Sequence, residues 1–449
     1  MSEAENPPPP LNLAGTHINL DNFGSDSTEQ ALIERRARHL GLNMLFYSDP
    51  VQLVRGDGVW LFDAEGKRYL DCYNNVPCVG HTNPRVVEAM AAQAAILNTH
   101  TRYLHEAIVD YADRLTQTLP GGLDVCVFVN SGTEANELAM RIARSVSRNN
   151  GTVVMENSYH GNSTLINELS MMAQPRGARA DHVVAVDPPD RYFGALGPHG
   201  DYAALVGPAL AELDSRGQGV AAFLCDSIFD SHGGLEAPEH YFRDAYALTR
   251  AAGGLCIADE VQPGFARTGP MWGFLHDDVV PDIVTFGKPA GNGFPLAGII
   301  TSREIMNEFE RRNAYFNTFG GSPVAAAVGG AVLDEIENHD LCNRVAKVGD
   351  HLQVLLERLM DKHRSIGDVR GRGLYRGVEL VTDRDTKEPA TDLARQIPDA
   401  MKEAGVLMGI TGSRGNVLKI RPPLVFDESN ADQLAETLDS VLVKLEPSS

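Results

Sequence analysis

Several kinds of segment are missing from this chain of 449 residues. No uninterrupted apolar run approaches the length that a membrane-spanning helix needs, and the N-terminal stretch MSEAENPPPP lacks the apolar core of a signal peptide. The six cysteines form no CxxC pair and no zinc-ligand pattern. Because six cysteines in so long a chain do not make a disulfide scaffold, we expect a reducing, cytoplasmic location and no membrane partner.

Basic residues are also scarce. Lys and Arg number 39 against 60 Asp and Glu, which gives a formal net charge of −21 and a sequence pI near 5.0. Such an acidic chain is not expected to bind nucleic acid through a broad basic face. Hydrophobic residues make up 43% and charged residues 22%, as in folded globular proteins, and the length favours more than one domain.

Lysine is especially rare, with 8 copies against 31 arginines. The single lysine between Lys67 and Lys347 is Lys288. Any chemistry in that long stretch that needs an amine therefore has one candidate.

The middle of the chain alternates between short apolar runs and amphipathic helical segments. The runs are rich in Val and Ile and barely alternate with polar residues, which is typical of buried parallel strands. They lie at 124–130, 152–155, 182–186, 220–225, 254–258, 282–286 and 297–301. Helices are expected at 133–146, 201–215 and 237–251. This order predicts an α/β fold with a mainly parallel sheet of about seven strands, covered by helices on both faces.

The two ends of the chain follow a different order. Residues 1 to 26 are rich in proline and polar residues, so we expect an extended arm, then a helix capped by Ser27. The segment 51–71 alternates and turns like a small antiparallel sheet. The predicted parts are an N-terminal arm with part of a small domain (1–82), a large domain (83–323) and a smaller C-terminal α/β domain (324–449).

Lys288 stands in DIVTFGKPAGNGFP, directly after an apolar strand and before a glycine-rich turn. Ligands of open α/β sheets bind outside the carboxyl ends of the strands. The glycines around Lys288 would let a planar molecule approach the backbone. A lysine in a surface loop is the ordinary alternative, and the apolar, otherwise lysine-free surroundings weigh against it.

Two further motifs follow apolar strands. Asp259 ends the run LCIAD, where an ionised carboxylate could hold a protonated heterocyclic nitrogen or simply cap a loop. Ser131, Gly132 and Thr133 open a helix, and free N–H groups at a helix start together with two hydroxyls can bind an anion. Because Ser131 and Glu134 are three residues apart, an ordinary capping box is the alternative.

Together these parts fit pyridoxal 5'-phosphate (PLP). In such a site the lysine forms a Schiff base, the carboxylate keeps the pyridine nitrogen protonated, the helix start binds the phosphate and the ring takes up electrons. Tyr159 and His160 in NSYHG offer an aromatic group for one ring face, and Val261 offers an apolar contact for the other. A core or turn aromatic is the alternative for Tyr159.

The segments SGTEANELAMRIAR, SYHG, ADEVQPGFARTG, FGKPAGNGFP and NTFGGSPVAAA resemble, in the same order, the class III aminotransferases, which are PLP enzymes of fold type I. The similarity extends over nearly the whole chain, from the region of residue 45 to residue 444. The resemblance implies a large domain with a seven-stranded sheet, a small domain built from both chain ends, and a homodimer with active sites at the interface.

The resemblance also implies a role for each residue of the cofactor site. Lys288 would carry the cofactor, Asp259 would pair with the pyridine nitrogen, and Gln262 would bind the ring hydroxyl. The cofactor phosphate would be bound by Gly132 and Thr133 and, from the neighbouring subunit, by Thr318.

Within the family, YLDCYNNVPCVGHTNPRVVEA and ILNTHTRYLHEAIVDYADRLTQTLP look most like the branch that contains ethanolamine-phosphate and phosphohydroxylysine phospho-lyases. Alanine–glyoxylate aminotransferases of the mitochondrial type share the NNVP-like segment. A phospho-lyase that removes phosphate and ammonia from O-phosphoethanolamine, giving acetaldehyde, therefore ranks first. An ω-aminotransferase that passes an amino group to a keto acid such as pyruvate or glyoxylate ranks second.

A phosphate leaving group or a substrate carboxylate needs cationic donors. Arg421 in KIRPPL is the family's usual substrate-anion arginine. Lesser cationic candidates are Arg267, Lys419 and Arg102; a surface ion pair is the alternative for each, and is preferred for the last two. Tyr47 and Asn75 fall where the family's pocket entrance lies. The expected substrate is a small phosphorylated or terminal amine.

Four positions depart from residues that are usual in the family. Asp226 stands where Glu is usual, Pro263 and Ala266 stand where Val and Gly are common, and Asn162 follows the glycine of SYHG. These changes could alter the substrate pocket without touching the cofactor residues.

Two other classes of protein remain as alternatives. One is a non-catalytic protein with a PLP-enzyme fold, and the retained Lys288 argues against it. The other is a metal enzyme. No metal is expected, because His81, His100 and His105 match no ligand spacing.

Overall fold

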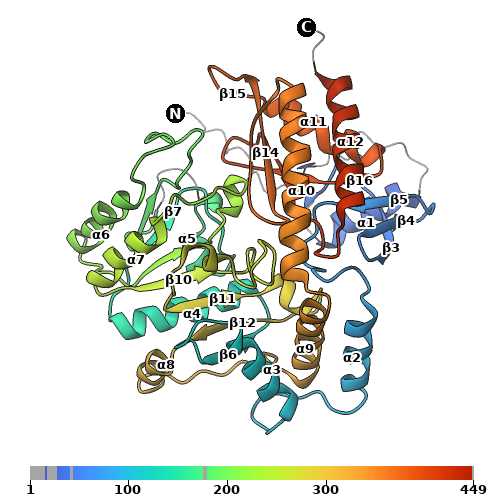
Figure 1. The fold of residues 1–449 in the computed structure, drawn as a ribbon. Coiled ribbons are helices and arrows are strands. Elements are labelled where there is room, and N and C mark those ends of the chain that lie inside the picture. The colour runs from blue at the N-terminus through green and yellow to red at the C-terminus, as the bar shows by residue number, and fades with distance from the viewer. Residues whose placement is uncertain (1–15, 18–27, 41–43, 175–178, 447–449) are drawn as a thin grey trace, which may run out of the picture.

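The computed structural model describes residues 16–17, 28–40, 44–174 and 179–446. Figure 1 shows two parts side by side. One is a wide sheet with its helices, formed by the middle of the chain. The other contains the C-terminal helices and, next to them, the N-terminal strands.

The wide sheet has seven strands in the order β6-β12-β11-β10-β9-β7-β8. Neighbouring strands are parallel except at β12, which is antiparallel to both β11 and β6. The strands are β6 (Val125–Val129), β7 (Thr152–Met155), β8 (Val183–Val186), β9 (Ala222–Cys225), β10 (Leu255–Asp259), β11 (Ile283–Phe286) and β12 (Ala297–Thr301). The predicted seven-stranded, mainly parallel sheet is confirmed.

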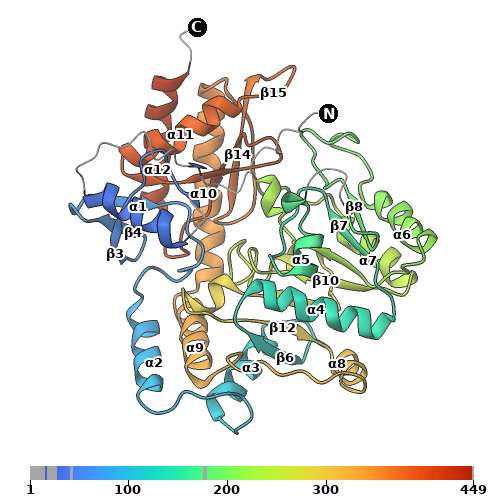
Figure 2. The same cartoon turned by 180° about the vertical axis from the view of Figure 1, so that it is seen from behind.

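Helices cover both faces of this sheet (Figure 2). On one face lie α4 (Gly132–Ser147), α5 (Thr164–Leu169) and α8 (Arg303–Glu310); on the other lie α6 (Val206–Ser215) and α7 (Tyr241–Ala251). The expectation of helix over 201–215 and 237–251 was too long at the N-terminal ends. A 3-10 turn precedes α6, and His240, with a φ of 69°, stops α7 from starting earlier.

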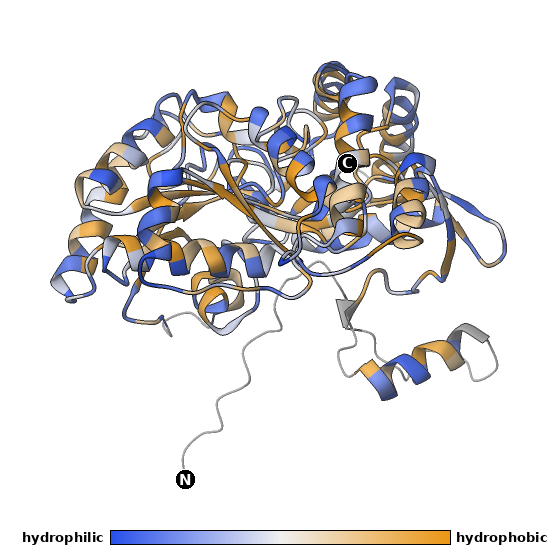
Figure 3. Ribbon diagram, turned by 90° about the horizontal axis from the view of Figure 1, so that it is seen from below, coloured by the Kyte–Doolittle hydropathy of each residue, from blue (hydrophilic) through white to orange (hydrophobic). Residues whose placement is uncertain are grey.

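The apolar strands lie between these helices, which turn polar residues outward (Figure 3). Every residue of β7, β9, β11 and β12 is buried. Leu138 and Ile142 of α4 belong to the core on one face, and Leu210 and Phe242 of α6 and α7 belong to the core on the other. Burial on both faces explains why the strands read as continuous apolar runs.

The chain ends form the second part. A sheet of order β13-β14-β18-β17 contains β13 (Ile366–Arg370), β14 (Arg376–Asp383), β17 (Gly409–Thr411) and β18 (Val417–Ile420), and β15 (Glu388–Pro389) pairs with β14. A second sheet joins β16 (Val406–Leu407) to β5 (Arg68–Asp71), β4 (Trp60–Asp63) and β3 (Leu53–Asp57). The parallel pair β16–β5 therefore brings the two ends of the chain into one sheet.

The remaining elements connect or cover these sheets. They are β1 (Thr16–His17), β2 (Met44–Leu45), α1 (Thr28–Leu40), α2 (Pro84–Ala94), α3 (Glu106–Gln117), α9 (Pro323–Asn338), α10 (Leu341–Lys362), α11 (Thr391–Glu403) and α12 (Glu428–Leu445). Helix α9 packs against α2 and α3, and α10 packs against α12. The expected cap of α1, Ser27, lies outside the described residues, as does most of the expected N-terminal arm.

A close backbone contact joins the two parts beside Arg267. The N–H of Leu374 donates to the carbonyl of Arg267 at 3.1 Å. Gly373 has a φ of 55°, and a Cβ built on it would lie 2.6 Å from the carbonyl carbon of Thr268. Only glycine fits this position, because both its conformation and its surroundings exclude a side chain.

We expect Gly373→Ala to lower the free energy of unfolding by ~2 kcal/mol, because the added methyl strains the backbone and meets backbone atoms. Thermal unfolding of the holoenzyme would measure this as a clear fall in Tm. Gly330→Ala in α9 is the matched control, since its Cβ would meet nothing closer than 4.0 Å and helix propensity improves. Equal Tm values for the two variants would contradict this view of the junction.

Candidate active site

Three of the predicted motifs meet at one edge of the central sheet. Strands β10 and β11 are parallel neighbours, so Asp259 and Lys288, which follow them, leave the sheet at the same edge. The start of α4 lies against both: a Cβ on Gly132 would be 2.9 Å from two methyls of Val261, and one on Gly287 would be 3.2 Å from the Gly132 nitrogen. The glycines thus allow the close approach that brings the motifs together.

Lys288 occupies an unusual backbone position. Its φ of 27° is one that few residues other than glycine adopt, and it opens a 3-10 turn, Lys288–Gly291. Its side chain is half-buried and makes no hydrogen bond or ion pair with any residue in the described part of the chain. Burial lowers the pKa of the amine, and the Asp230 carboxylate partly opposes this effect. An unpaired amine with a lowered pKa suits a nucleophile.

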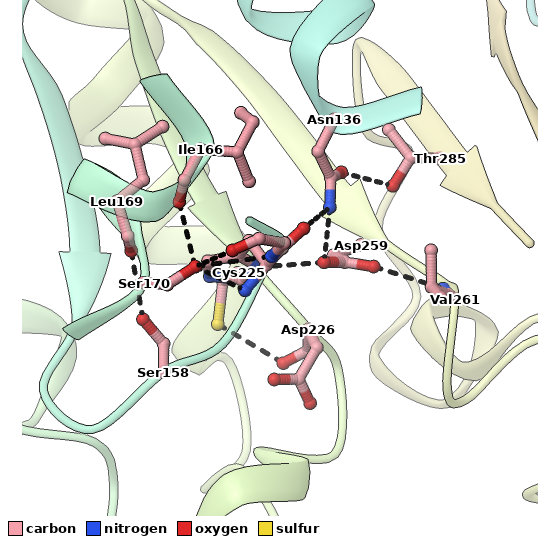
Figure 4. A network of polar contacts seen from close by, with 12 residues as sticks. Asn136, Ser158, Ile166, Leu169, Ser170, Cys225, Asp226, Asp259, Val261 and Thr285 are labelled. Atoms are coloured by element: carbon pink, nitrogen blue, oxygen red, sulfur yellow. Dashed lines mark hydrogen bonds and ion pairs between the residues drawn. The ribbon is translucent and has the colours of Figure 1, made fainter. Parts of the chain in front are cut away.

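Asp259 is buried and held by three donors (Figure 4). Its Oδ2 accepts hydrogen bonds from Asn136 Nδ2 at 2.9 Å and contacts His160 Nδ1 at 2.7 Å, and its Oδ1 accepts one from the Val261 N–H at 3.1 Å. The His160 ring and the Val261 backbone therefore meet Asp259 directly. A carboxylate held this firmly keeps a fixed direction toward a ligand.

Asn136 was missed by sequence reasoning. It lies on the buried side of α4, where Nδ2 also donates to the His160 carbonyl at 2.7 Å and Oδ1 accepts from the Thr285 hydroxyl at 2.7 Å. These bonds join α4, β10 and β11 around Asp259 (Figure 4). The only signal in the sequence is an amide among apolar residues on that helix face.

The start of α4 has free donors. The N–H groups of Gly132 and Thr133 have no acceptor among the described residues. The Ser131 hydroxyl accepts from the Glu134 N–H at 3.2 Å, so Ser131 does cap the helix, as the alternative interpretation held. Thr133 Oγ1 lies 3.2 Å from Asn162 Oδ1, which brings one of the unusual residues of this chain to the anion site.

Other predicted residues lie around this centre. Asn75, almost fully buried, donates through Nδ2 to Gln262 Oε1. The Tyr47 hydroxyl donates to the Met408 carbonyl at 3.2 Å. Tyr159 is 39% exposed, and Thr318 lies exposed beside Asn317, whose Nδ2 donates to Glu134 Oε1 at 3.3 Å. The roles of these side chains toward a ligand stay predictions.

A buried charge cluster, Lys419–Asp230–Arg421, lies near Lys288. Lys419 Nζ donates to Asp230 Oδ2 at 2.8 Å, while Arg421 Nη1 is 3.8 Å from Asp230 Oδ1 and has no hydrogen-bond partner among the described residues. Burial alone would raise the pKa of Asp230, but the two cations outweigh it and hold the pKa at about 2. The preference for Lys419 as a surface ion pair was wrong: it is only 6% exposed.

Arg421 is fixed by the turn that precedes α2. Its Nε donates to the Tyr73 carbonyl at 3.0 Å, and its guanidinium lies 4.5 Å from the centre of the Tyr73 ring. Asp71 holds this turn by accepting hydrogen bonds from the N–H groups of Tyr73 and Asn74. These contacts orient the Arg421 guanidinium and leave its Nη1 without a hydrogen-bond partner among the described residues.

The two other cationic candidates lie elsewhere. Arg267 is 2% exposed, and its Nη1 donates to the carbonyls of Leu374 and Pro422. These bonds fix the junction between the two parts of the molecule. Arg102 is exposed and stacks on Phe316, 4.0 Å from the ring centre.

The departures from the family pattern also have structural consequences. Asp226 is half-buried, and its Oδ1 accepts the N–H groups of Ile228 and Asp230; desolvation raises its pKa to about 7. Ala266 has a φ of 64°, which explains why glycine is common at that position.

The site fits PLP. The free N–H groups at the start of α4 suit its phosphate, the buried Asp259 suits its ring nitrogen, and the unpaired Lys288 amine suits its aldehyde. Glycines 132 and 287 keep side chains out of the space between these groups. The described residues contain no group of three or more His, Cys, Asp or Glu side chains placed to hold a metal ion.

Comparisons with known proteins show the family to which the chain belongs. Residues 47–442 match the family model of the class-III aminotransferases. The chain is 42% identical over 417 residues to an alanine–glyoxylate aminotransferase 2-like protein of Drosophila melanogaster (89% of this chain, 84% of that protein). It is 38% identical over 440 residues to ethanolamine-phosphate phospho-lyase homolog 1 of Caenorhabditis elegans (92% and 94%).

Among solved structures, a phospholyase from Arthrobacter in complex with phosphoethanolamine superposes with a TM-score of 0.89 at 42% identity, covering 92% of this chain and all of that one. Fold and site together define a PLP-dependent enzyme of fold type I. The chain belongs to the class III aminotransferase family. Within the described residues, no helix is both long and apolar enough to cross a membrane.

We expect Lys288→Ala to abolish covalent retention of PLP, because no other amine is free at this edge of the sheet among the described residues. The visible absorbance of the bound cofactor and the mass of the peptide labelled after borohydride reduction would measure this. Lys347→Ala, which removes an exposed lysine paired with Glu428, is the control and should retain the label. A variant without Lys288 that still bound PLP covalently would refute the assignment.

Asn136→Ala should raise the Kd for PLP about 10- to 100-fold, because Asp259 loses a hydrogen bond to a charged group, worth roughly 1.5–3 kcal/mol. Titration of the apoenzyme with PLP, followed by absorbance, would measure the change. Asn313→Ala is the control: its Nδ2 donates to Ser145 Oγ at 2.7 Å and to the Phe309 carbonyl at 3.0 Å, and neither partner is one of the site residues described above. An unchanged Kd in Asn136→Ala would show that Asp259 does not depend on this amide.

Proposed function

We propose that this enzyme is a phospho-lyase that eliminates phosphate and ammonia from O-phosphoethanolamine, giving acetaldehyde, or from a similar phosphorylated amine. One observation carries the proposal: two buried cations, Lys419 and Arg421, share one carboxylate, Asp230. Within the part of the chain that the structure describes, the cluster keeps one uncompensated positive charge and a free donor, Arg421 Nη1. Such a site favours the binding of an anion. A phosphate can contact both cations at once more readily than a carboxylate can.

Each residue of the site has its own role in the proposed reaction. PLP supplies the sink for the electrons of the broken carbon–hydrogen bond. The Lys288 amine, whose pKa burial lowers, takes the proton from the carbon that bears the amino group. Asp259 would hold the ring nitrogen, and the start of α4 would hold the cofactor phosphate. Arg421 and Lys419 would bind the substrate phosphate as its negative charge grows.

The relatives support the same proposal. The Caenorhabditis elegans protein is named as a homologue of an ethanolamine-phosphate phospho-lyase, and the Arthrobacter structure holds phosphoethanolamine. The Drosophila melanogaster relative is named after an alanine–glyoxylate aminotransferase. The second candidate is therefore an ω-aminotransferase, in which Arg421 would bind a substrate carboxylate bidentately.

We also propose a homodimer with shared active sites. Large apolar side chains are exposed on the segments around α3 and before α9: Ile96 (79%), Tyr103 (65%), Leu104 (102%), Phe316 (45%) and Phe319 (75%). A second copy would cover this surface and bring Thr318 to the neighbouring cofactor phosphate. We also propose a reducing, cytoplasmic location, in which the six free cysteines would stay as thiols.

A product assay without any keto acid tests the function directly. PLP-loaded enzyme given O-phosphoethanolamine should release phosphate and acetaldehyde over many turnovers, because elimination leaves the cofactor unchanged. Lys288→Ala is the negative control. If no product forms, while alanine and a keto acid are turned over with conversion of the cofactor to its amine form, the transaminase is correct and the phospho-lyase is wrong.

A further inference from the structure

Lys419 and Arg421 are two residues apart at the end of β18, and both are more than nine-tenths buried. The charged and titratable groups around Lys419 come from several elements: Asp230 after β9, Lys288 after β11, Arg421, and Tyr375 before β14, whose ring centre is 5.7 Å from Nζ. The Tyr375 hydroxyl donates to the Asp230 carbonyl at 2.8 Å. The ammonium is therefore held from two sides, with Asp230 as its only ion-pair partner among the described residues.

The proposed reaction requires more than a cation at this place. A phosphate monoester is largely a dianion at neutral pH, since its second pKa is about 6. Cleavage of its carbon–oxygen bond would release a trianion unless a proton reaches the departing phosphate. A donor that supplies this proton contributes about 10²- to 10⁴-fold to the rate, and it works best when its pKa is near the operating pH.

Of the two cations proposed to hold the substrate phosphate, only one can supply this proton. Arg421 cannot, because a guanidinium does not lose its proton in a protein. Lys288 is not one of this pair, because in the proposed reaction it takes the proton from the carbon that bears the amino group. The Lys419 ammonium is different: burial and the nearby charge of Arg421 lower its pKa to about 8. Lys419 is thus both a charge that attracts phosphate and an acid that can give up its proton.

We propose that Lys419 is the general acid of the elimination, oriented by Asp230; this inference rests on the proposed phospho-lyase activity. The carbon–oxygen bond breaks, and its electron pair leaves with the phosphate oxygen. A proton moves from Lys419 Nζ to the departing phosphate, which leaves as HPO₄²⁻. The neutral amine regains a proton from water when the product leaves. Arg421 stays charged throughout and holds the phosphate.

Two esters of ethanolamine separate this role from simple charge attraction. O-sulfoethanolamine has a leaving group that needs no proton, because sulfate is the anion of a strong acid. The Lys419→Arg variant keeps a cation at this position, but a guanidinium does not give up its proton. We expect kcat/KM for O-phosphoethanolamine to fall at least 100-fold, and kcat/KM for O-sulfoethanolamine to fall less than tenfold.

A measurement on the unmodified holoenzyme avoids any effect of the substitution on folding. With O-phosphoethanolamine, kcat should decline at alkaline pH as Lys419 loses its proton; with O-sulfoethanolamine this decline should be absent. Binding of inorganic phosphate, measured by calorimetry, should be kept in Lys419→Arg and weakened in Lys419→Met. This result would separate binding from proton transfer.

The outcomes distinguish the two proposals. If the unmodified enzyme releases phosphate but Lys419→Arg keeps its rate, or both esters slow equally in the variant, or both esters share the same pH profile, the general acid is refuted and the phospho-lyase stands. If the unmodified enzyme releases no phosphate from O-phosphoethanolamine, the proposed function itself fails, and this inference fails with it.

Discussion

Parallel pairing of β9, β10 and β11 is the constraint on which the site depends. Parallel strands point their carboxyl ends to the same edge, so Asp226, Asp259 and Lys288, which end or follow these strands, are brought together although 62 residues separate the first from the last. The antiparallel β12 fills the gap between β11 and β6 and brings the start of α4 to the same edge. Without this arrangement the motifs would be isolated segments.

The glycines at this edge make the arrangement possible. Gly132 and Gly287 lie so close to their neighbours that a methyl group on either would meet Val261 or the backbone of α4. The N–H groups at the start of α4 are free because the first turn of a helix offers them no acceptor. The space for a planar cofactor and the donors for its phosphate therefore lie side by side, the first left by glycines and the second by the start of a helix.

The second part of the molecule supplies the charge of the site. Strand β18 carries Lys419 and leads directly to Arg421, while Asp230 comes from the loop after β9 of the central sheet. The ion pair between Lys419 and Asp230 therefore joins the two parts at the site. A buried ion pair of this kind contributes little net stability, because desolvation offsets its attraction, and this favours a functional reason for its presence.

Much of the cofactor site could be predicted, since each residue there has a local signal: a lone lysine after a strand, an acid at a strand end, a hydroxyl and a glycine at a helix start. The role of Asn136 and the burial of Lys419 could not be predicted. An amide on a helix face and a lysine on a short strand look the same in sequence whether they face solvent or a carboxylate 100 or more residues away. Their partners are decided by packing, not by neighbours in the chain.

The sequence by itself determined the α/β alternation, the seven strands and the family, because apolar periodicity and contiguous motifs are local properties. The residues at which helices begin were predicted less accurately. In α7, for example, a single residue with positive φ overrides the amphipathic pattern. Only the tertiary structure decided which charges are buried together. The cluster of Lys419, Asp230 and Arg421 exists because two sheets from distant parts of the chain meet, and desolvation there alters the pKa of each charged group.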